Sequence, residues 1–186
     1  MGCAINFFRK VESTEQKTQL EKRFLILGLD GAGKTSILNR LASRDFSETI
    51  PTVGLNAEQI VYQNTSFAFW DVGGAATNLW KHYYQNTDAV IFVIDGTDRE
   101  RMDLVKEELA GVLKDADLTE CPLLIYANKQ DKEGAISMDE LSKILEFDKT
   151  EKKSKFLVPC SALKNEGLLP GLDKIVEVIN RTTPKS

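Results

Sequence analysis

The stretch FLILGLDGAGKT, residues 24–35, decides the fold. Its first half is a continuous apolar run, which is typical of a strand buried on both faces. From Gly28 to Thr35 it matches the pattern G-x-x-x-x-G-K-[ST], in which glycines let backbone N–H groups converge on phosphate oxygens. A helical pattern follows over residues 34–44, and a helix N-terminus adds partial positive charge. These features predict a phosphate-binding loop, here called the phosphate loop (residues 28–35), at the end of a strand.

Short apolar runs alternate with helical patterns along the rest of the chain. We predict strands at residues 55–62, 66–72, 89–95, 123–128 and 156–160, and helices at residues 102–112, 138–145 and 168–179. The first two of these strands read as a hairpin. Continuous apolar strands that alternate with helices predict an α/β fold with a mostly parallel sheet covered by helices on both faces. Ligands bind such sheets at the carboxyl ends of the strands.

Composition narrows the class of protein. The chain has 186 residues, which suits one domain, and a formal net charge of −4, so it lacks the basic footprint of a nucleic-acid-binding protein. Its three cysteines are scattered, which argues against a disulfide framework and favours a reducing compartment. The single histidine, His82, excludes chemistry that needs two.

Residues suited to phosphate and magnesium chemistry stand at predicted strand ends. Lys34 would reach the β- and γ-phosphates, and Thr35 would ligate Mg²⁺. Asp71 ends the strand before WDVGG and suits an indirect hold on Mg²⁺, although it could instead cap the following helix. Gly74 allows the chain to approach a γ-phosphate, and Thr52, in the loop TIPTVG, could offer its hydroxyl to Mg²⁺.

A second group of residues points to the base of a nucleotide. Asp131, in the run NKQD, can accept hydrogen bonds from N1–H and the 2-amino group of guanine, which adenine does not offer. Asn128 would contact the ring edge or tie loops together, and the stem of Lys129 can lie over the base plane. Ser161 and Ala162 follow the last strand, where a backbone N–H could meet guanine O6. Taken alone, each of these two segments would read as an ordinary turn.

The motifs GLDGAGKTS, TIPTVG, WDVGG and NKQD, with the S-A of PCSAL, resemble those of ADP-ribosylation factor and Arf-like small GTPases. The resemblance implies six strands with five helices, bound GTP or GDP with Mg²⁺, and a monomer served by an exchange factor, an activating protein and effectors. It implies a cytoplasmic protein that associates reversibly with Golgi or other endomembranes in vesicle trafficking. The catalytic residues it implies are Lys34, Thr52 and Gly74, and the nucleotide-binding residues are Asp30, Gly31, Ala32, Gly33, Lys34, Thr35, Ser36, Thr52, Gly74, Asn128, Lys129, Asp131, Ser161 and Ala162.

The N-terminus indicates a membrane-directed arm. We divide the chain into an arm (1–22), a GTPase domain (23–182) and a short tail (183–186). Gly2 follows Met1, as in N-myristoylated proteins, although Asn6 stands where the simple motif has Ser or Thr. Cys3 is either palmitoylated or an unmodified thiol. Residues 4–11 place apolar and basic side chains on different faces of a small interfacial helix. In the family, strands between the two switch loops slide on activation and expel this helix onto membrane.

One position departs from the family pattern. The motif WDVGG continues with glutamine in the family, where it orients the attacking water, but Ala75 stands there in this chain. Alanine cannot hydrogen-bond a water, so we expect slow GTP hydrolysis. Three alternatives stay open: a switch with weak self-inactivation, a switch whose partner supplies the missing group, and a GTP-dependent scaffold with essentially no hydrolysis. A kinase that uses ATP shares the phosphate loop but is disfavoured by NKQD.

Overall fold

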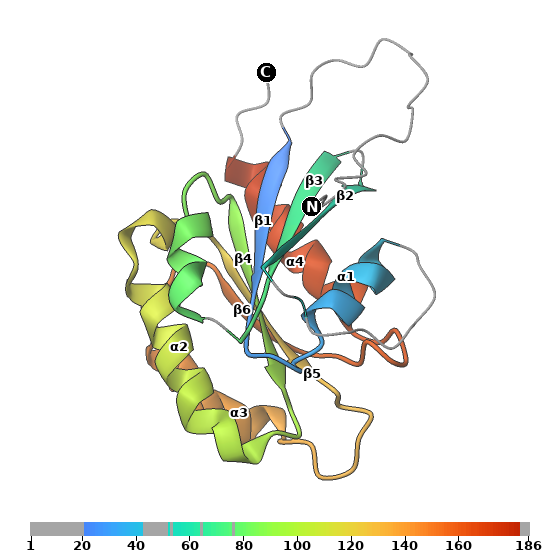
Figure 1. Ribbon diagram of the computed structural model, residues 1–186, viewed down its shortest axis with the longest axis vertical. Coiled ribbons are helices and arrows are strands. Elements are labelled where there is room, and N and C mark those ends of the chain that lie inside the picture. The colour runs from blue at the N-terminus through green and yellow to red at the C-terminus, as the bar shows by residue number, and fades with distance from the viewer. Residues whose placement is uncertain (1–20, 43–51, 53, 64, 76, 183–186) are drawn as a thin grey trace, which may run out of the picture.

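The strand β1 (Lys22–Leu27) lies near the middle of a six-stranded sheet (Figure 1). The computed structural model describes residues 21–42, 52, 54–63, 65–75 and 77–182. The strand order is β2-β3-β1-β4-β5-β6, and within it β2 alone runs antiparallel to its neighbour. The other strands are β2 (Leu55–Tyr62), β3 (Thr65–Val72), β4 (Ala89–Asp95), β5 (Leu123–Asn128) and β6 (Lys155–Pro159).

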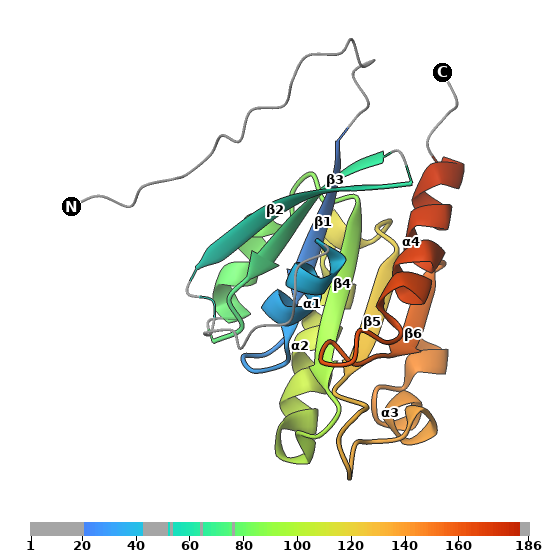
Figure 2. The same cartoon turned by 90° about the vertical axis from the view of Figure 1, so that its right-hand side faces the viewer.

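Helices cover both faces of the sheet (Figure 2). One face carries α1 (Lys34–Leu41) and α4 (Leu168–Thr182), and the other carries η1 (Thr77–Tyr83), α2 (Met102–Lys114) and α3 (Met138–Ile144). Successive residues of β4 point to opposite faces, so Ile91 packs in the first layer and Phe92 in the second. This is why its first six residues, 89–94, read as one continuous apolar run. Short 3₁₀ segments are η2 (Arg99–Arg101), η3 (Ala116–Leu118) and η4 (Phe147–Lys149).

The predicted element boundaries hold best for β2, β4 and β5, which match residue for residue. The first strand is shifted: we predicted residues 24–29, but β1 starts at Lys22. Its polar first residues are held by tertiary partners, since the Arg23 guanidinium lies 3.8 Å from the centre of the Trp70 ring and Arg23 N donates to Asp88 at 2.8 Å. The strand ends before Gly28, whose φ is 139°. The last strand likewise starts and ends one residue earlier than predicted.

The helices differ in one respect from the family expectation of five. The described residues form four α-helices, and residues 77–83 form the 3₁₀ helix η1. The helix predicted over 34–44 ends at Leu41 among the described residues. The arm up to residue 20, the loop 43–51 and the tail 183–186 lie outside the described residues. Within the part of the chain that the structure describes, no helix is both long and apolar enough to cross a membrane.

Candidate nucleotide-binding site

The loops that carry the predicted site residues leave the sheet at one edge, the lower edge in Figure 1. The strands β1, β3, β4, β5 and β6 are parallel, so their carboxyl ends meet there. Because β2 is antiparallel to β3, the start of β2 lies at the same edge, and this brings Thr52 toward the loop after β3. The topology therefore gathers residues that are more than 100 positions apart in the sequence.

Lys34 is the buried cation of the phosphate loop, with 6% of its surface exposed. Its Nζ donates to the carbonyl oxygens of Gly28 at 2.8 Å and Leu29 at 3.0 Å, which use two of the three ammonium donors. Burial lowers the pKa of Lys34, while the charges of Asp71 and Asp30 act in the opposite direction. A positive charge thus stands at the N-terminus of α1, where the helix dipole also favours an anion.

Three oxygen-bearing side chains meet beside this lysine. Thr35 Oγ1 donates to Asp71 Oδ2 at 2.5 Å, Thr52 Oγ1 lies 3.2 Å from the same oxygen, and the two hydroxyl oxygens lie 2.8 Å apart. Asp71 is fully buried, and its Oδ1 has no hydrogen-bond partner within the described residues. Burial raises the pKa of Asp71, against the lowering effect of both threonines and of Lys34. Asp71 therefore contacts the two predicted metal ligands instead of capping the following helix.

Gly74 lies directly against the phosphate loop. A Cβ added to it would lie 2.3 Å from the backbone N of Asp30 and 2.4 Å from the carbonyl oxygen of Gly28, so only glycine fits in this arrangement. The next residue, Ala75, is exposed, and its methyl group offers no hydrogen bond. The segment after β3 thus touches the phosphate loop at the position predicted for a γ-phosphate contact.

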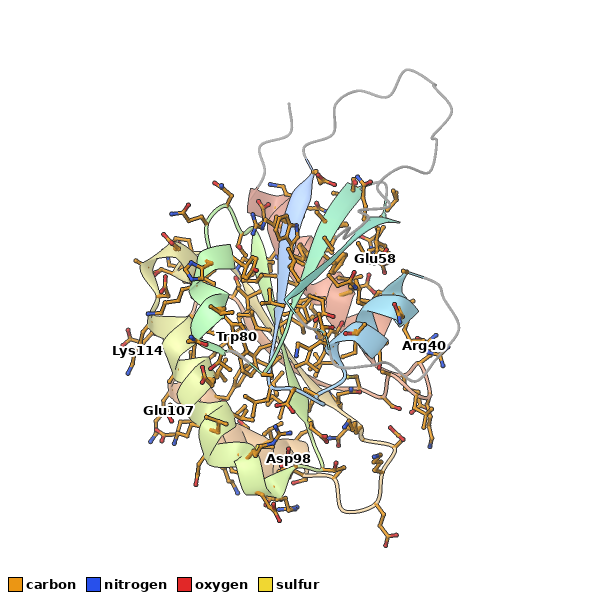
Figure 3. The ribbon with its side chains drawn as sticks, in the orientation of Figure 1. Arg40, Glu58, Trp80, Asp98, Glu107 and Lys114 are labelled. Carbon is orange, nitrogen blue, oxygen red and sulfur yellow. The ribbon has the colours of Figure 1, made fainter. Side chains whose placement is uncertain are left out.

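Trp80 connects this segment to the rest of the sheet (Figure 3). Its side chain from η1 is 1% exposed and packs edge-on against Phe92 of β4, with ring centroids 6.0 Å apart. The indole Nε1 donates to the carbonyl oxygen of Gly73 at 3.1 Å, and Gly73 N donates to Gly54 O at 2.8 Å. The Trp80 side chain therefore joins η1 to the loop after β3, and a backbone hydrogen bond joins that loop to the one before β2.

Asn128, the last residue of β5, ties three loops together. It is 2% exposed, its Nδ2 donates to Ala32 O at 2.9 Å, and its Oδ1 accepts from Ala162 N at 3.0 Å. Gly33 has a φ of 95°, and a Cβ there would lie 2.3 Å from Nδ2 of Asn128. Of the two roles predicted for Asn128, these contacts match that of tying the loops.

The predicted base-reading carboxylate, Asp131, is oriented by Ser161. Ser161 Oγ donates to Asp131 Oδ1 at 2.6 Å and accepts from Lys164 N at 3.0 Å. A backbone hydrogen bond joins the same two loops, since Gln130 N donates to Cys160 O at 3.1 Å. The loops after β5 and β6 therefore present Asp131, Ser161 and Ala162 together, as their positions in the sequence predicted.

Two residues at the site were not predicted. Asp95 ends β4 and lies 2.5 Å from Nζ of Lys129. The sequence pattern that could have pointed to Asp95 is an acidic residue at the end of an apolar strand, which is the pattern that identified Asp71. Arg101 donates to Asp30 Oδ1 at 2.8 Å and to Asp30 O at 3.1 Å. It also donates to Asp98, at the lower end of the molecule in Figure 3. No local sequence pattern predicts the contact between Arg101 and Asp30.

This arrangement defines the class: a phosphate-loop motif and the N-K-Q-D loop lie at one edge of a six-stranded α/β sheet, as in small GTP-binding proteins. The sequence model "Arf: ADP-ribosylation factor family" matches residues 7–179, and the chain belongs to this family of GTP-binding small GTPases. The resemblance drawn from the motifs is thereby confirmed. Small GTPases of this family generally work with exchange factors, activating proteins and effectors.

Relatives are similar over most of the chain. ADP-ribosylation factor J of Dictyostelium discoideum is 44% identical over 162 residues, 86% of each chain. ADP-ribosylation factor-like protein 1 of Saccharomyces cerevisiae is 45% identical over 161 residues, 86% of this chain and 88% of the relative. The structure of the Arl6 BBS3 small GTPase from Trypanosoma brucei, with bound nucleotide analogue GppNp, superposes with a TM-score of 0.81 at 34% identity, covering 88% of this chain and 99% of that one. This likeness confirms the predicted fold.

Proposed function

We propose that this protein is a molecular switch that cycles between GDP- and GTP-bound states, hydrolyses GTP slowly and recruits effectors to membranes. The observation that carries the proposal is the meeting of the phosphate and base residues at one sheet edge: Lys34 in the phosphate loop, Thr35 and Thr52 on Asp71, and Asp131 on Ser161. The GppNp held by the Trypanosoma brucei protein supports a nucleoside triphosphate as the ligand of this fold.

Phosphate binding would use the backbone from Asp30 to Ser36, which covers the end of the phosphate loop and the start of α1, together with the ammonium of Lys34. The loop already surrounds that ammonium with carbonyl oxygens, so the charge is oriented before any ligand arrives. Gly74 would contact the γ-phosphate from the opposite side, since it packs on the same loop. These groups stabilise negative charge, which is the main task in phosphoryl transfer.

The residues around Asp71 fit a magnesium ion. Mg²⁺ takes oxygen ligands and keeps several waters, and the cluster offers the hydroxyls of Thr35 and Thr52 with a buried carboxylate behind them. The Oδ1 of Asp71, which has no hydrogen-bond partner among the residues that the structure describes, is a further acceptor suited to a water on the ion. We propose Thr35 and Thr52 as direct ligands and Asp71 as an indirect one. When bound, the ion neutralises charge that develops on the β- and γ-phosphate oxygens.

Guanine selectivity would reside in Asp131, because its carboxylate can accept two hydrogen bonds that adenine cannot donate. Ser161 uses Oδ1 of this carboxylate and holds its orientation. We expect Asp131→Asn to lose the preference for GDP over ADP, measured by competition against a fluorescent guanine nucleotide. An unchanged preference would count against guanine recognition and revive the ATP-using kinase.

Slow hydrolysis is expected from Ala75, which is exposed and cannot orient a water. The test is single-turnover GTP hydrolysis by the wild type, Ala75→Gln and the matched control Ala75→Leu. We expect glutamine to raise the rate by about tenfold or more and leucine to leave it unchanged, since a side-chain amide can hydrogen-bond and orient the attacking water and an alkyl group cannot. Equal rates for the wild type and Ala75→Gln would refute the role given to Ala75.

The same assay separates the second candidate function, a GTP-dependent scaffold with essentially no hydrolysis. The exposed alanine favours this candidate as much as it favours a slow switch. If the wild type keeps its GTP intact and releases no phosphate while the Ala75→Gln variant hydrolyses GTP in the same assay, the protein is a scaffold. Measurable release by the wild type identifies a slow switch.

Membrane association would come from the arm, residues 1–22, most of which lies outside the described residues. We propose myristoylation of Gly2, with the amphipathic helix or a palmitoylated Cys3 as the second membrane signal, because one myristoyl chain binds only marginally. Co-expression with an N-myristoyltransferase, mass spectrometry and vesicle flotation test this. We expect flotation to require a GTP analogue and to fail for Gly2→Ala. Cys3→Ser shows whether the thiol contributes. Golgi or endosomal membranes, and a monomeric state in solution, remain part of this proposal.

A further inference from the structure

Asp95 stands at the base side of the site, and none of the nucleotide-directed motifs assigns it a task. We propose that Asp95 is a positioning residue for guanine: it fixes the ammonium of Lys129 so that the aliphatic stem of that lysine forms one wall of the base pocket. The inference rests on the proposed function, because it presumes a guanine nucleotide at this edge of the sheet.

The contacts of Asp95 leave its carboxylate little freedom. Oδ2 lies 2.5 Å from Nζ of Lys129. Oδ1 accepts from the backbone N of Thr97 at 2.9 Å and from its Oγ1 at 2.7 Å. Three donors thus engage both oxygens of one carboxylate. Burial alone would raise the pKa of Asp95, but the hydrogen bonds from Lys129 and Thr97 lower it overall, so the carboxylate is charged at neutral pH.

The backbone makes this anchor part of the base loop. Asp95 pairs with Asn128 in the register of β4 and β5. Asn128 is the residue directly before Lys129. Gly96 N donates to Asn128 O at 2.9 Å, and Ile136 N donates to Gly96 O at 2.7 Å. The end of β4 is therefore bonded to both ends of the segment 128–136. A side chain fixed to Asp95 is fixed relative to Asn128, and through it to Asp131.

The side chain of Lys129 would be held poorly without the contact to the Asp95 carboxylate. The φ of Lys129 is 65°, in the left-handed region that non-glycine residues rarely adopt. Its side chain is 26% exposed, whereas that of Asp95 is 13% exposed, so the pair is shielded more than a surface ion pair. A lysine that lacks a partner samples many rotamers and loses that freedom when a ligand packs on its stem. The charge-assisted bond to Asp95 restricts the lysine rotamers before guanine binds, so guanine binding costs less side-chain entropy.

The experiment measures GDP release from the full-length protein with a fluorescent GDP analogue. Asp95→Asn keeps the shape but turns an amide group toward the ammonium. We expect release about tenfold faster, because bonds to charged groups contribute roughly one to two factors of ten. Asp88→Asn is the matched control: Asp88 precedes β4 at its other end, and Lys22 Nζ lies 3.1 Å from it. We expect its release rate to stay at the wild-type value. Unchanged or slower release from Asp95→Asn overturns the proposal.

A second measurement separates positioning from a general structural role. In a Lys129→Met background the anchored group is gone, so we expect Asp95→Asn to cause no further acceleration. A carboxylate that only stabilises the fold would accelerate release by the same factor in both backgrounds, which overturns the proposal. Tight GDP binding without this coupling refutes the positioning role alone. A wild type that binds GDP no more tightly than ADP refutes the proposed function as well.

Discussion

Asn128→Ala should destabilise the nucleotide-free protein strongly, although it removes only one small side chain. The amide of Asn128 pairs with two buried backbone groups, Ala32 O at 2.9 Å and Ala162 N at 3.0 Å. Alanine leaves both without that partner, and each unsatisfied buried group costs about 1–3 kcal/mol. The expected loss is therefore about 2–6 kcal/mol, a large part of the roughly 5–15 kcal/mol that holds a typical domain folded.

The assay is urea unfolding in EDTA, followed by far-UV circular dichroism, with Asn39→Ala as the control. Asn39 is a half-buried asparagine of α1 that lies outside the site, and alanine is the better helix former there. We expect the control to keep or slightly raise stability. Saturating GDP should also stabilise Asn128→Ala less than the wild type, because its three loops are no longer joined. A loss below about 1 kcal/mol, or one equal to that of the control, would refute the role of Asn128 as the tie between loops.

Three further variants test the phosphate side. Burial raises the pKa of Asp71, so in metal-free protein its contribution to stability is present below the ordinary value of 3.8 and is lost as pH rises through the raised pKa. Asp71→Asn should therefore melt at a higher temperature than the wild type in EDTA near neutral pH, and should gain less from Mg²⁺ with GDP; a lower melting temperature would contradict this. Trp80→Phe keeps one aromatic ring but loses the rest of the indole and its bond to Gly73 O, and urea unfolding should show a loss of about 1 kcal/mol or more. Gly74→Ala places a Cβ within 2.4 Å of phosphate-loop backbone, and overpacking of this kind costs about 1–3 kcal/mol. Because GTP alone carries the γ-phosphate that Gly74 would contact, titration should show binding of a GTP analogue weakened more than that of GDP, and equal weakening of both would exclude a γ-phosphate role.

The sequence predicted those parts of the structure that depend on neighbours along the chain. The strands β2, β4 and β5 were placed residue for residue, because apolar runs bounded by turn residues mark them. The start of β1 was missed, because Lys22 and Arg23 look like linker residues until Asp88 and the Trp70 ring are placed beside them. Polar residues with long stems can enter a strand when a distant partner covers them, and no local pattern records that partner.

The site residues divide in the same way, into those that local sequence motifs predict and those that depend on distant partners. Lys34, Thr35 and Asp131 stand in contiguous motifs, so their positions could be read directly from the sequence. The pairs that hold the motifs in place could not: 34 residues separate Asp95 from Lys129, and 71 separate Arg101 from Asp30. These contacts depend on which strands are neighbours, and the sequence predicted the strands but not their order in the sheet.

That strand order also divides the site into two parts that are bonded to different strands. The base side is carried by β4, β5 and β6, which lie side by side and whose loops are bonded through Asn128 and Asp95. The proposed metal side takes Thr52 from the loop before β2, which is the edge strand. The backbone hydrogen bond between Gly54 and Gly73 joins that loop to the loop after β3, and the indole of Trp80 joins the loop after β3 to η1. A ligand shifts a conformational equilibrium only by its differential affinity for the two states, and GDP and GTP differ only in the γ-phosphate. Because guanine is common to both nucleotides, we infer that the base side would set how tightly either is held, and that the edge hairpin with η1 would distinguish them.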